Sequence, residues 1–376
     1  MTKIKYSFYI MAALLLMFQS KTDAQVSLQL LTDQEYNSNP FRSRIPESNF
    51  ISSYDFTLQY EFGKAGIMYN GTAFSFNNTQ DRNFYYHMGG VWYNFDSSSV
   101  SLSAEQRINN PIYSYFNYSE LALNYEHKFS FWGITANIYP SITYTSYTSI
   151  SILNNVKSTL LFSLNKSFET KTTFIVGGGV NHKIYTQPSA SDLFLPVNDP
   201  NQTVETLVQS QNATTLTQLT GYGRVAQSIT PTTGLALQLT GKKIVSGIAS
   251  SVKDLSLTYG DEAEIFDDPV NYEGTSLAVE LTQILFEDLQ LRLGYYYNLK
   301  NYPSQGIYDH TNTYFSDVER ADTQNILGFS AKKTFSAGEY LSIDLGFRFY
   351  YIKNSSNSFL YKYNSSAFSF NVGFTF

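Results

Sequence analysis

The sequence predicts an all-β fold, a transmembrane antiparallel β-barrel of about 16 strands, and three independent patterns lead to it. Apolar and polar residues alternate with a period of two along most of the chain, which is typical of strands with two different faces. The connections between these segments alternate between long and short. Aromatic residues make up 16% of the chain, but charged residues only 15%, below the value of about 25% in soluble proteins.

The alternation marks sixteen segments. They are residues 25–36, 50–63, 65–76, 83–95, 98–107, 114–130, 132–146, 155–166, 171–186, 212–229, 232–247, 272–286, 288–299, 321–335, 339–353 and 362–376. Such long strands suit a membrane span of about 9–11 tilted residues, whereas strands of soluble sandwiches are mostly about 5–6 residues long. The alternation is irregular around Met88, Gly89 and Gly90, so a barrel of 14 strands stays open as an alternative.

The connections provide the second pattern. Short ones such as 63–65, 167–170 and 336–338 alternate with long ones such as 37–49, 187–211, 248–271 and 300–320. Outer-membrane barrels have short periplasmic turns and long outer loops, so this asymmetry predicts that both chain ends lie in the periplasm. Proline, which removes a hydrogen-bond donor from the ladder, lies outside the predicted strands or at their ends except at Pro140, where we expect a bulge.

The N-terminal residues predict export. Lys3 and Lys5 precede a short apolar run, YIMAALLLMF, and a polar stretch that ends at Ala24. This is the layout of a secretory signal peptide covering residues 1–24, which leaves residues 25–376 as one outer-membrane barrel domain. The apolar run is too short for a transmembrane helix, which needs roughly 20 residues.

The last predicted strand carries a distinctive C-terminal pattern. One face of SAFSFNVGFTF consists of Phe368, Phe370, Val372, Phe374 and Phe376. With its terminal Phe, this strand resembles the last strand of Gram-negative outer-membrane β-barrels of the porin-like kind. The resemblance implies that Phe370, Val372, Phe374 and Phe376 form the signal that the barrel-assembly machinery recognises. We expect this strand to close the barrel against the first one near Val26 to Leu31.

Charged residues within the predicted strands oppose the apolar face. A charge facing lipid costs roughly 2–4 kcal/mol at the membrane centre, so these residues are expected to face the lumen. The predicted pore-lining residues are Glu105, Arg107, Arg224, Lys242, Glu280, Arg292, Asp344 and Arg348. A barrel of about sixteen strands leaves room for an aqueous channel, whereas about eight strands fill with side chains.

Acidic residues gather in the predicted outer loop 248–271. They are Asp254, Asp261, Glu262, Glu264, Asp267 and Asp268. Their spacing matches no calcium-binding loop, so a solvated acidic outer loop is the favoured interpretation and no metal site or cofactor is predicted. The four His residues lie in no recognisable catalytic motif, which argues against a lipid-modifying enzyme. A net charge of -6 without a basic cluster argues against nucleic acid as a partner.

Two functions remain in view. The first is a porin-like channel or transporter in the cell outer membrane, through which small hydrophilic solutes diffuse passively. The second is a surface adhesion or assembly barrel with a closed lumen that acts through its outer loops. Both place the protein among outer-membrane lipids. The substrate does not follow from the sequence.

Overall fold

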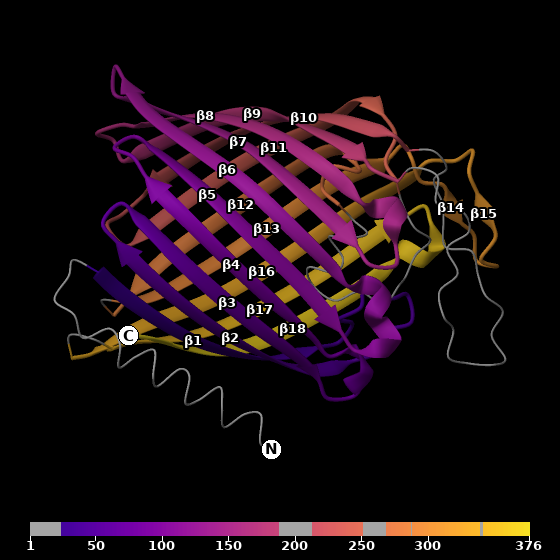
Figure 1. The fold of residues 1–376 in the computed structure, drawn as a ribbon, viewed down its shortest axis with the longest axis horizontal. Coiled ribbons are helices and arrows are strands. Elements are labelled where there is room, and N and C mark those ends of the chain that lie inside the picture. The colour runs from indigo at the N-terminus through magenta and orange to yellow at the C-terminus, as the bar shows by residue number, and fades with distance from the viewer. Residues whose placement is uncertain (1–23, 188–212, 251–267, 287, 339–340) are drawn as a thin grey trace.

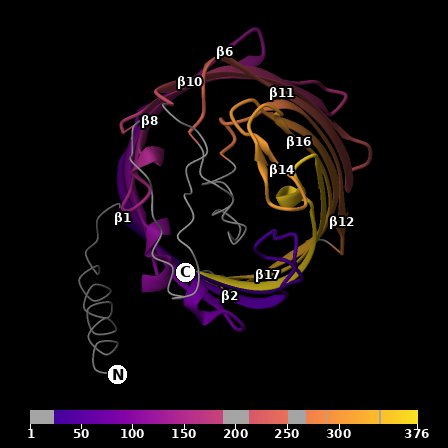
Figure 2. The same cartoon turned by 90° about the vertical axis from the view of Figure 1, so that its right-hand side faces the viewer.

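The computed structural model describes residues 24–187, 213–250, 268–286, 288–338 and 341–376, and its main feature is a closed antiparallel barrel (Figures 1 and 2). The barrel strands are β1 (Ala24–Asn37), β2 (Asn49–Phe62), β3 (Ala65–Phe76), β4 (Phe84–Asn94), β5 (Ser98–Asn109), β6 (Tyr118–Phe131), β7 (Ile134–Tyr147), β8 (Asn155–Ser167), β9 (Thr172–Tyr185), β10 (Thr215–Ser228), β11 (Thr233–Gly247), β12 (Glu273–Leu285), β13 (Leu289–Tyr302), β16 (Arg320–Ala337), β17 (Leu341–Ser356) and β18 (Tyr363–Thr375). The predicted sixteen strands are thereby confirmed, and β4 and β5 form the hairpin that a 14-strand barrel would lack.

Two features of the connections differ from the prediction. The start of the predicted segment 114–130 is part of the 3-10 helix η2 (Pro111–Phe116), because Pro111 suits a first helical position. The connection after β13 carries a small hairpin, β14 (Ile307–Tyr308) with β15 (Tyr314–Phe315), which projects from one end of the barrel (Figure 1). We call this the loop end and the opposite one the turn end. Three further 3-10 helices lie at the loop end: η1 (Gln80–Arg82), η3 (Ser151–Leu153) and η4 (Phe359–Tyr361).

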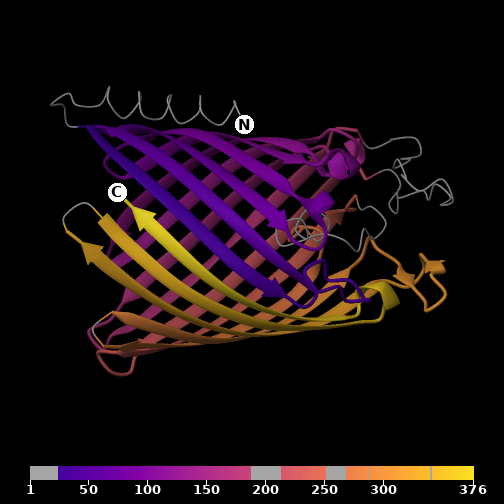
Figure 3. The same ribbon diagram turned by 90° about the horizontal axis from the view of Figure 1, so that it is seen from below.

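The first and last strands close the barrel. β1 pairs with β18 along a register that runs from Gln29 opposite Thr375 to Asn37 opposite Ala367. The final residue extends the seam, because Phe376 donates its N–H to the Leu28 carbonyl at 2.9 Å and its carbonyl accepts from Leu28 N–H at 3.2 Å. Figure 3 shows the two strands side by side. The predicted pairing of the chain ends is confirmed.

The barrel wall has the two chemical faces that the alternation predicts. On β18, Phe368 and Phe370 are about half exposed on the outside, at 46% and 50%, whereas Ser369 between them is 5% exposed and points inward. The inward position of Ser369 is fixed by its hydrogen bond at 3.1 Å from the guanidinium of Arg348 on β17. Apolar side chains therefore cover the outside of the barrel, and polar ones line the inside.

Pro140 does not produce the expected bulge. Asn124 pairs with Ser141 and His127 with Ile138, so the register between β6 and β7 is the same on both sides of the proline. Pro140 lacks the N–H donor that a ladder partner would need, and regular pairing is interrupted on the β6 side only. A register shift occurs elsewhere, between Thr217 and Gln218 on β10.

Among the described residues, no helix has both the length and the hydrophobicity to cross a membrane.

Deleting Phe374 to Phe376 tests the closing seam. The deletion removes the last pairs with β1 and leaves N–H and C=O groups of β1 without partners in hydrocarbon, at several kcal/mol each. We expect a severe loss of folded barrel, measured as heat-modifiable mobility of the membrane fraction on a gel. Deleting Thr311 to Thr313 from the exposed β14–β15 hairpin is the control of equal length. Equal loss from both deletions would contradict the role of the seam.

Candidate functional site

Ion pairs and hydrogen bonds cross the inner face of the barrel. Arg224 on β10 contacts Glu280 on β12 at 3.0 Å and reaches over Gln238 of the intervening strand. Arg348 on β17 contacts Asp33 on β1 and likewise spans the strand between them. Such bridges require all partners to lie on one face of the sheet. The inner face is therefore lined by charges of both signs.

The other predicted lumen residues lie on the same face, with one difference. Asp344 contacts Lys332 at 3.2 Å, and Arg292 lies next to the outward-facing Leu293 on the opposite side of β13. Arg107, in contrast, is 0% exposed, because Asn109 and Tyr86 accept its hydrogen bonds and its guanidinium lies 3.8 Å from the centre of the Phe84 ring. Its charge is held inside the wall and does not face open solvent. Alternation places a residue on a face but does not show how deeply its neighbours cover it.

A cavity of about 440 Å³ lies against the inner wall formed by β3 to β9. Its lining is mostly polar: Asn70, Thr72, Tyr86, Met88, Glu105, Tyr118, Glu120, Thr145, Tyr147, Asn155, Lys157, Lys183 and Asp268. The size falls within the range of small-molecule sites, roughly 300–1,000 Å³. Glu120, Lys157 and Lys183 were not singled out from the sequence, although the alternation that selected Glu105 places them on the same face.

Residues 268–272, which we call the docked segment, fold against the inside of the wall. Lys183 on β9 forms an ion pair with Asp268, whose other oxygen accepts the Val270 N–H at 2.8 Å. Gln218, which is 1% exposed, directs its amide nitrogen to the carbonyls of Pro269, Val270 and Tyr272 at 2.7–3.2 Å. Because Gln218 lies at the register shift of β10, the irregularity coincides with the anchor of this segment.

Lys242 provides a second anchor for the docked segment. Its ammonium donates to the Pro269 carbonyl and to the Tyr272 hydroxyl, both at 3.1 Å. Lys242 lies on the inner face, as predicted, and its ammonium group binds the docked segment of the chain itself. The docked segment is held by hydrogen bonds from three neighbouring strands, β9, β10 and β11.

The prediction of a solvated acidic outer loop is wrong at Asp268. This residue was predicted to belong to a solvated outer loop, but it lines the cavity and is neutralised by Lys183. An isolated carboxylate would lose its hydration there, so the neighbouring ammonium is required. The other acidic residues of the predicted loop lie outside the described residues: Asp254, Asp261, Glu262, Glu264 and Asp267.

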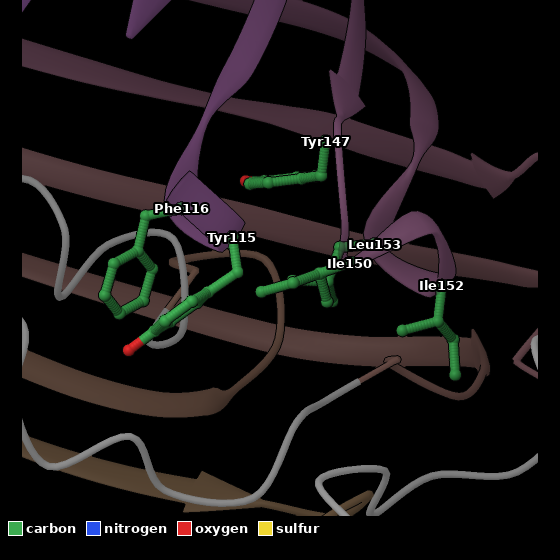
Figure 4. Close-up of a cluster of buried hydrophobic side chains, with 6 residues drawn as sticks. All are labelled: Tyr115, Phe116, Tyr147, Ile150, Ile152 and Leu153. Carbon is green, nitrogen blue, oxygen red and sulfur yellow. The ribbon is translucent and has the colours of Figure 1, made fainter. Parts of the chain in front are cut away.

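An apolar cluster supports the cavity rim at the loop end. Tyr115 and Phe116 of η2 pack with Ile150, Ile152 and Leu153 around η3, and Tyr147 joins this cluster from the end of β7 (Figure 4). Tyr147 also lines the cavity. The apolar residues of these two long connections therefore fix one wall of a polar site.

The histidines are dispersed over the barrel. His87 contacts the Tyr69 hydroxyl at 2.7 Å, His127 the Ser98 hydroxyl at 2.7 Å and His182 the Thr217 hydroxyl at 2.9 Å. His310 in the β14–β15 hairpin lies edge-on to Phe359. Within the part of the chain that the structure describes, no group of three His, Cys, Asp or Glu residues is arranged to hold a metal ion.

The fold matches solved outer-membrane proteins. OccAB1 of Acinetobacter baumannii superposes with a TM-score of 0.56 at 8% identity, covering 95% of this chain and 98% of that one. OccK2 (OpdF) of Pseudomonas aeruginosa, solved in complex with glucuronate, gives 0.53 at 8% identity, covering 94% and 98%. OprD of the same organism gives 0.50 at 10% identity, covering 95% and 97%. No protein-family description and no curated protein matches the sequence. The chain is itself a closed sixteen-strand antiparallel barrel, as predicted, and its fold is similar to that of these Gram-negative outer-membrane porins.

Two neighbouring positions on β13 test which face meets lipid. Leu293→Arg places a charge on the outer face, at a cost of roughly 2–4 kcal/mol near the membrane centre, and is expected to reduce folded yield. Arg292→Ala alters the inner face and is expected to leave folded yield unchanged. Both yields are measured by refolding into lipid vesicles. Similar losses in both variants would show that the faces are wrongly assigned.

Proposed function

We propose that the protein is an outer-membrane, porin-like channel through which small hydrophilic solutes diffuse. The observation that carries this proposal is the placement of charged pairs such as Arg224–Glu280 and Arg348–Asp33 on the inner face of a sixteen-strand barrel. A barrel of this size is wide enough for water, and charges of both signs favour a hydrated interior. The similar fold of OccK2, solved with the small hydrophilic acid glucuronate, is in keeping with such a role.

The proposed location follows from the chain ends. Residues 1–24 act as the signal peptide for export, and the loop end of the barrel faces the outside of the cell. Phe370, Val372, Phe374 and Phe376 on β18 serve as the signal for the barrel-assembly machinery. Phe370 and Phe376 are exposed on the barrel, which is compatible with recognition by a partner and, after insertion, with contact to outer-membrane lipids.

Transport is distinguished from the adhesion alternative by conductance. Purified protein in a planar lipid bilayer is expected to carry an ion current, and vesicles that contain it are expected to take up small sugars and acids. A folded barrel without current or uptake would favour the surface adhesion or assembly function instead. If a current is observed, the seven predicted pore-lining residues other than the buried Arg107 are the first positions to change for altered ion selectivity.

Asp268 provides a pH-dependent test. Burial on its own would raise the pKa of Asp268, but the ammonium groups of Lys183 and Lys157 and two hydrogen bonds lower it below the ordinary value of 3.8. Because the docked-state pKa is lowered, the stabilisation by Asp268 is complete above 3.8 and is lost as the pH falls through the lowered value. We expect the docked segment to narrow the lumen at neutral pH. The conductance is expected to rise only when the pH falls below the lowered pKa of Asp268.

Asp268→Asn is the matching variant. It replaces a charged contact worth about 1.5–3 kcal/mol by a weaker neutral one. We expect its conductance at neutral pH to exceed that of the unmodified protein, and the two conductances to converge in strong acid. Equal conductances at neutral pH would contradict a docked segment that narrows the channel.

A further inference from the structure

Two pairs of like charges face each other across neighbouring strands of the cavity wall. Glu105 on β5 lies directly opposite Glu120 on β6, and Lys157 on β8 lies directly opposite Lys183 on β9. All four side chains line the same cavity. Like charges in directly opposite positions destabilise a sheet. Repulsion within the acidic pair and within the basic pair therefore destabilises the wall, and the segregation of the two signs on two sides of one cavity calls for another explanation.

The protein itself satisfies one member of each pair. Lys183 is neutralised by Asp268 of the docked segment. Glu105 accepts a hydrogen bond from the Tyr118 hydroxyl at 2.5 Å. These contacts fix the two side chains in place. In each pair, the other side chain is therefore more available to a solute.

The other member of each pair is left open to a solute. Glu120 accepts one hydrogen bond, from the Thr145 hydroxyl at 2.9 Å, and among the described residues no cation contacts it. Lys157 has neither a hydrogen bond nor an ion pair within the described ranges, although it feels the charge of Asp268. A carboxylate and an ammonium group thus remain available in one half-enclosed polar space, and they do not contact each other.

The register sets their separation. Glu120 lies opposite Thr145 on β7, and Thr145 lies opposite Asn155 on β8, two residues before Lys157. Two strand spacings and a two-residue offset place the two backbones roughly 12 Å apart. Arg224 and Glu280 have the same offset and form an ion pair, so distance alone does not keep Glu120 and Lys157 apart. Because the charged ends of Glu120 and Lys157 line one cavity without contacting each other, a short ligand can lie between them.

From this arrangement we propose that the cavity binds small zwitterions, of the size of an amino acid or dipeptide, as they pass through the channel. Glu120 binds the ligand's ammonium group, and Lys157 binds its carboxylate. Thr145 holds the Glu120 carboxylate in position, and Asp268 keeps Lys183 from competing for the ligand's carboxylate. The inference rests on the proposed channel function and names its substrate class. Charge-assisted contacts at both ends distinguish a zwitterion from a solute with one charge.

Glycylglycine and two analogues test the site. N-acetylglycine keeps the carboxylate without the ammonium group, and glycylglycinamide keeps the ammonium group without the carboxylate. With the full protein in planar bilayers, we expect glycylglycine to reduce the ion current saturably at concentrations where neither analogue does. Glu120→Gln and Lys157→Gln should each raise the half-saturating concentration about ten-fold, the loss of one charge-assisted hydrogen bond. Both changes relieve a like-charge pair, so thermal unfolding should not move to lower temperature.

Glu126→Gln and Lys128→Gln are the matched controls. Both residues lie on the inner face of β6 but do not line the cavity. They are expected to leave the half-saturating concentration within about two-fold. Equal block by glycylglycine and N-acetylglycine would overturn the zwitterion site in favour of an anion site. Block that survives Glu120→Gln and Lys157→Gln would also overturn it.

Failure of the channel function can be separated from failure of the site. If the protein carries no ion current, the channel proposal fails, and calorimetric titration of the detergent-purified protein with glycylglycine decides the site. Heat that saturates in the unmodified protein and is lost in Glu120→Gln and Lys157→Gln supports a zwitterion site in a closed barrel. The absence of saturable heat in the unmodified protein overturns the inference.

Discussion

The structure depends on one constraint, that no backbone N–H or C=O group is left without a partner where hydrocarbon surrounds the chain. An open sheet edge would expose a row of such groups, at several kcal/mol each, so the sheet has to close on itself. The pairing of β1 with β18, extended by the two hydrogen bonds between Leu28 and Phe376, meets this requirement. Everything inside the barrel follows from closure, because only a closed sheet separates an inner space from the lipid.

Because the sheet is closed, each strand has one face toward lipid and one face toward the barrel interior. Residues such as Phe370 and Leu293 face outward, where apolar side chains are favoured. Inward positions hold charges, and several of these charges form ion pairs across a strand, as Arg224 does with Glu280. On the wall of β5 to β9, Glu120 and Lys157 face one cavity without an opposite charge in contact. A carboxylate and an ammonium group that line one cavity without contacting each other mark the place where we propose that a zwitterionic solute binds.

The sequence predicted the strands, their number and the closing pair, because a period of two and alternating connection lengths are local patterns. Contacts that depend on the register between strands could not be predicted from these local patterns. Asp268 was assigned to the outer solvent, since nothing local indicates that Lys183, 85 positions away, would hold it inside. Arg107 was placed on the correct face, but its burial arises from Phe84 and Tyr86 of the next strand. Cross-strand pairs of like charge appear only once each strand's neighbour and offset are known.

The central claim, a water-filled interior enclosed by a lipid-facing wall, is tested most directly by thiol accessibility at adjacent positions. The chain has no cysteine, so single substitutions report without background. Gln238 contacts Arg224 on the inner face of β11, and Leu239 next to it is 56% exposed on the outer face. In lipid vesicles, Gln238→Cys should react with a charged, water-soluble methanethiosulfonate reagent and Leu239→Cys should not, because a thiol in hydrocarbon does not ionise. Reaction at both positions, or failure at Gln238→Cys, would contradict the account.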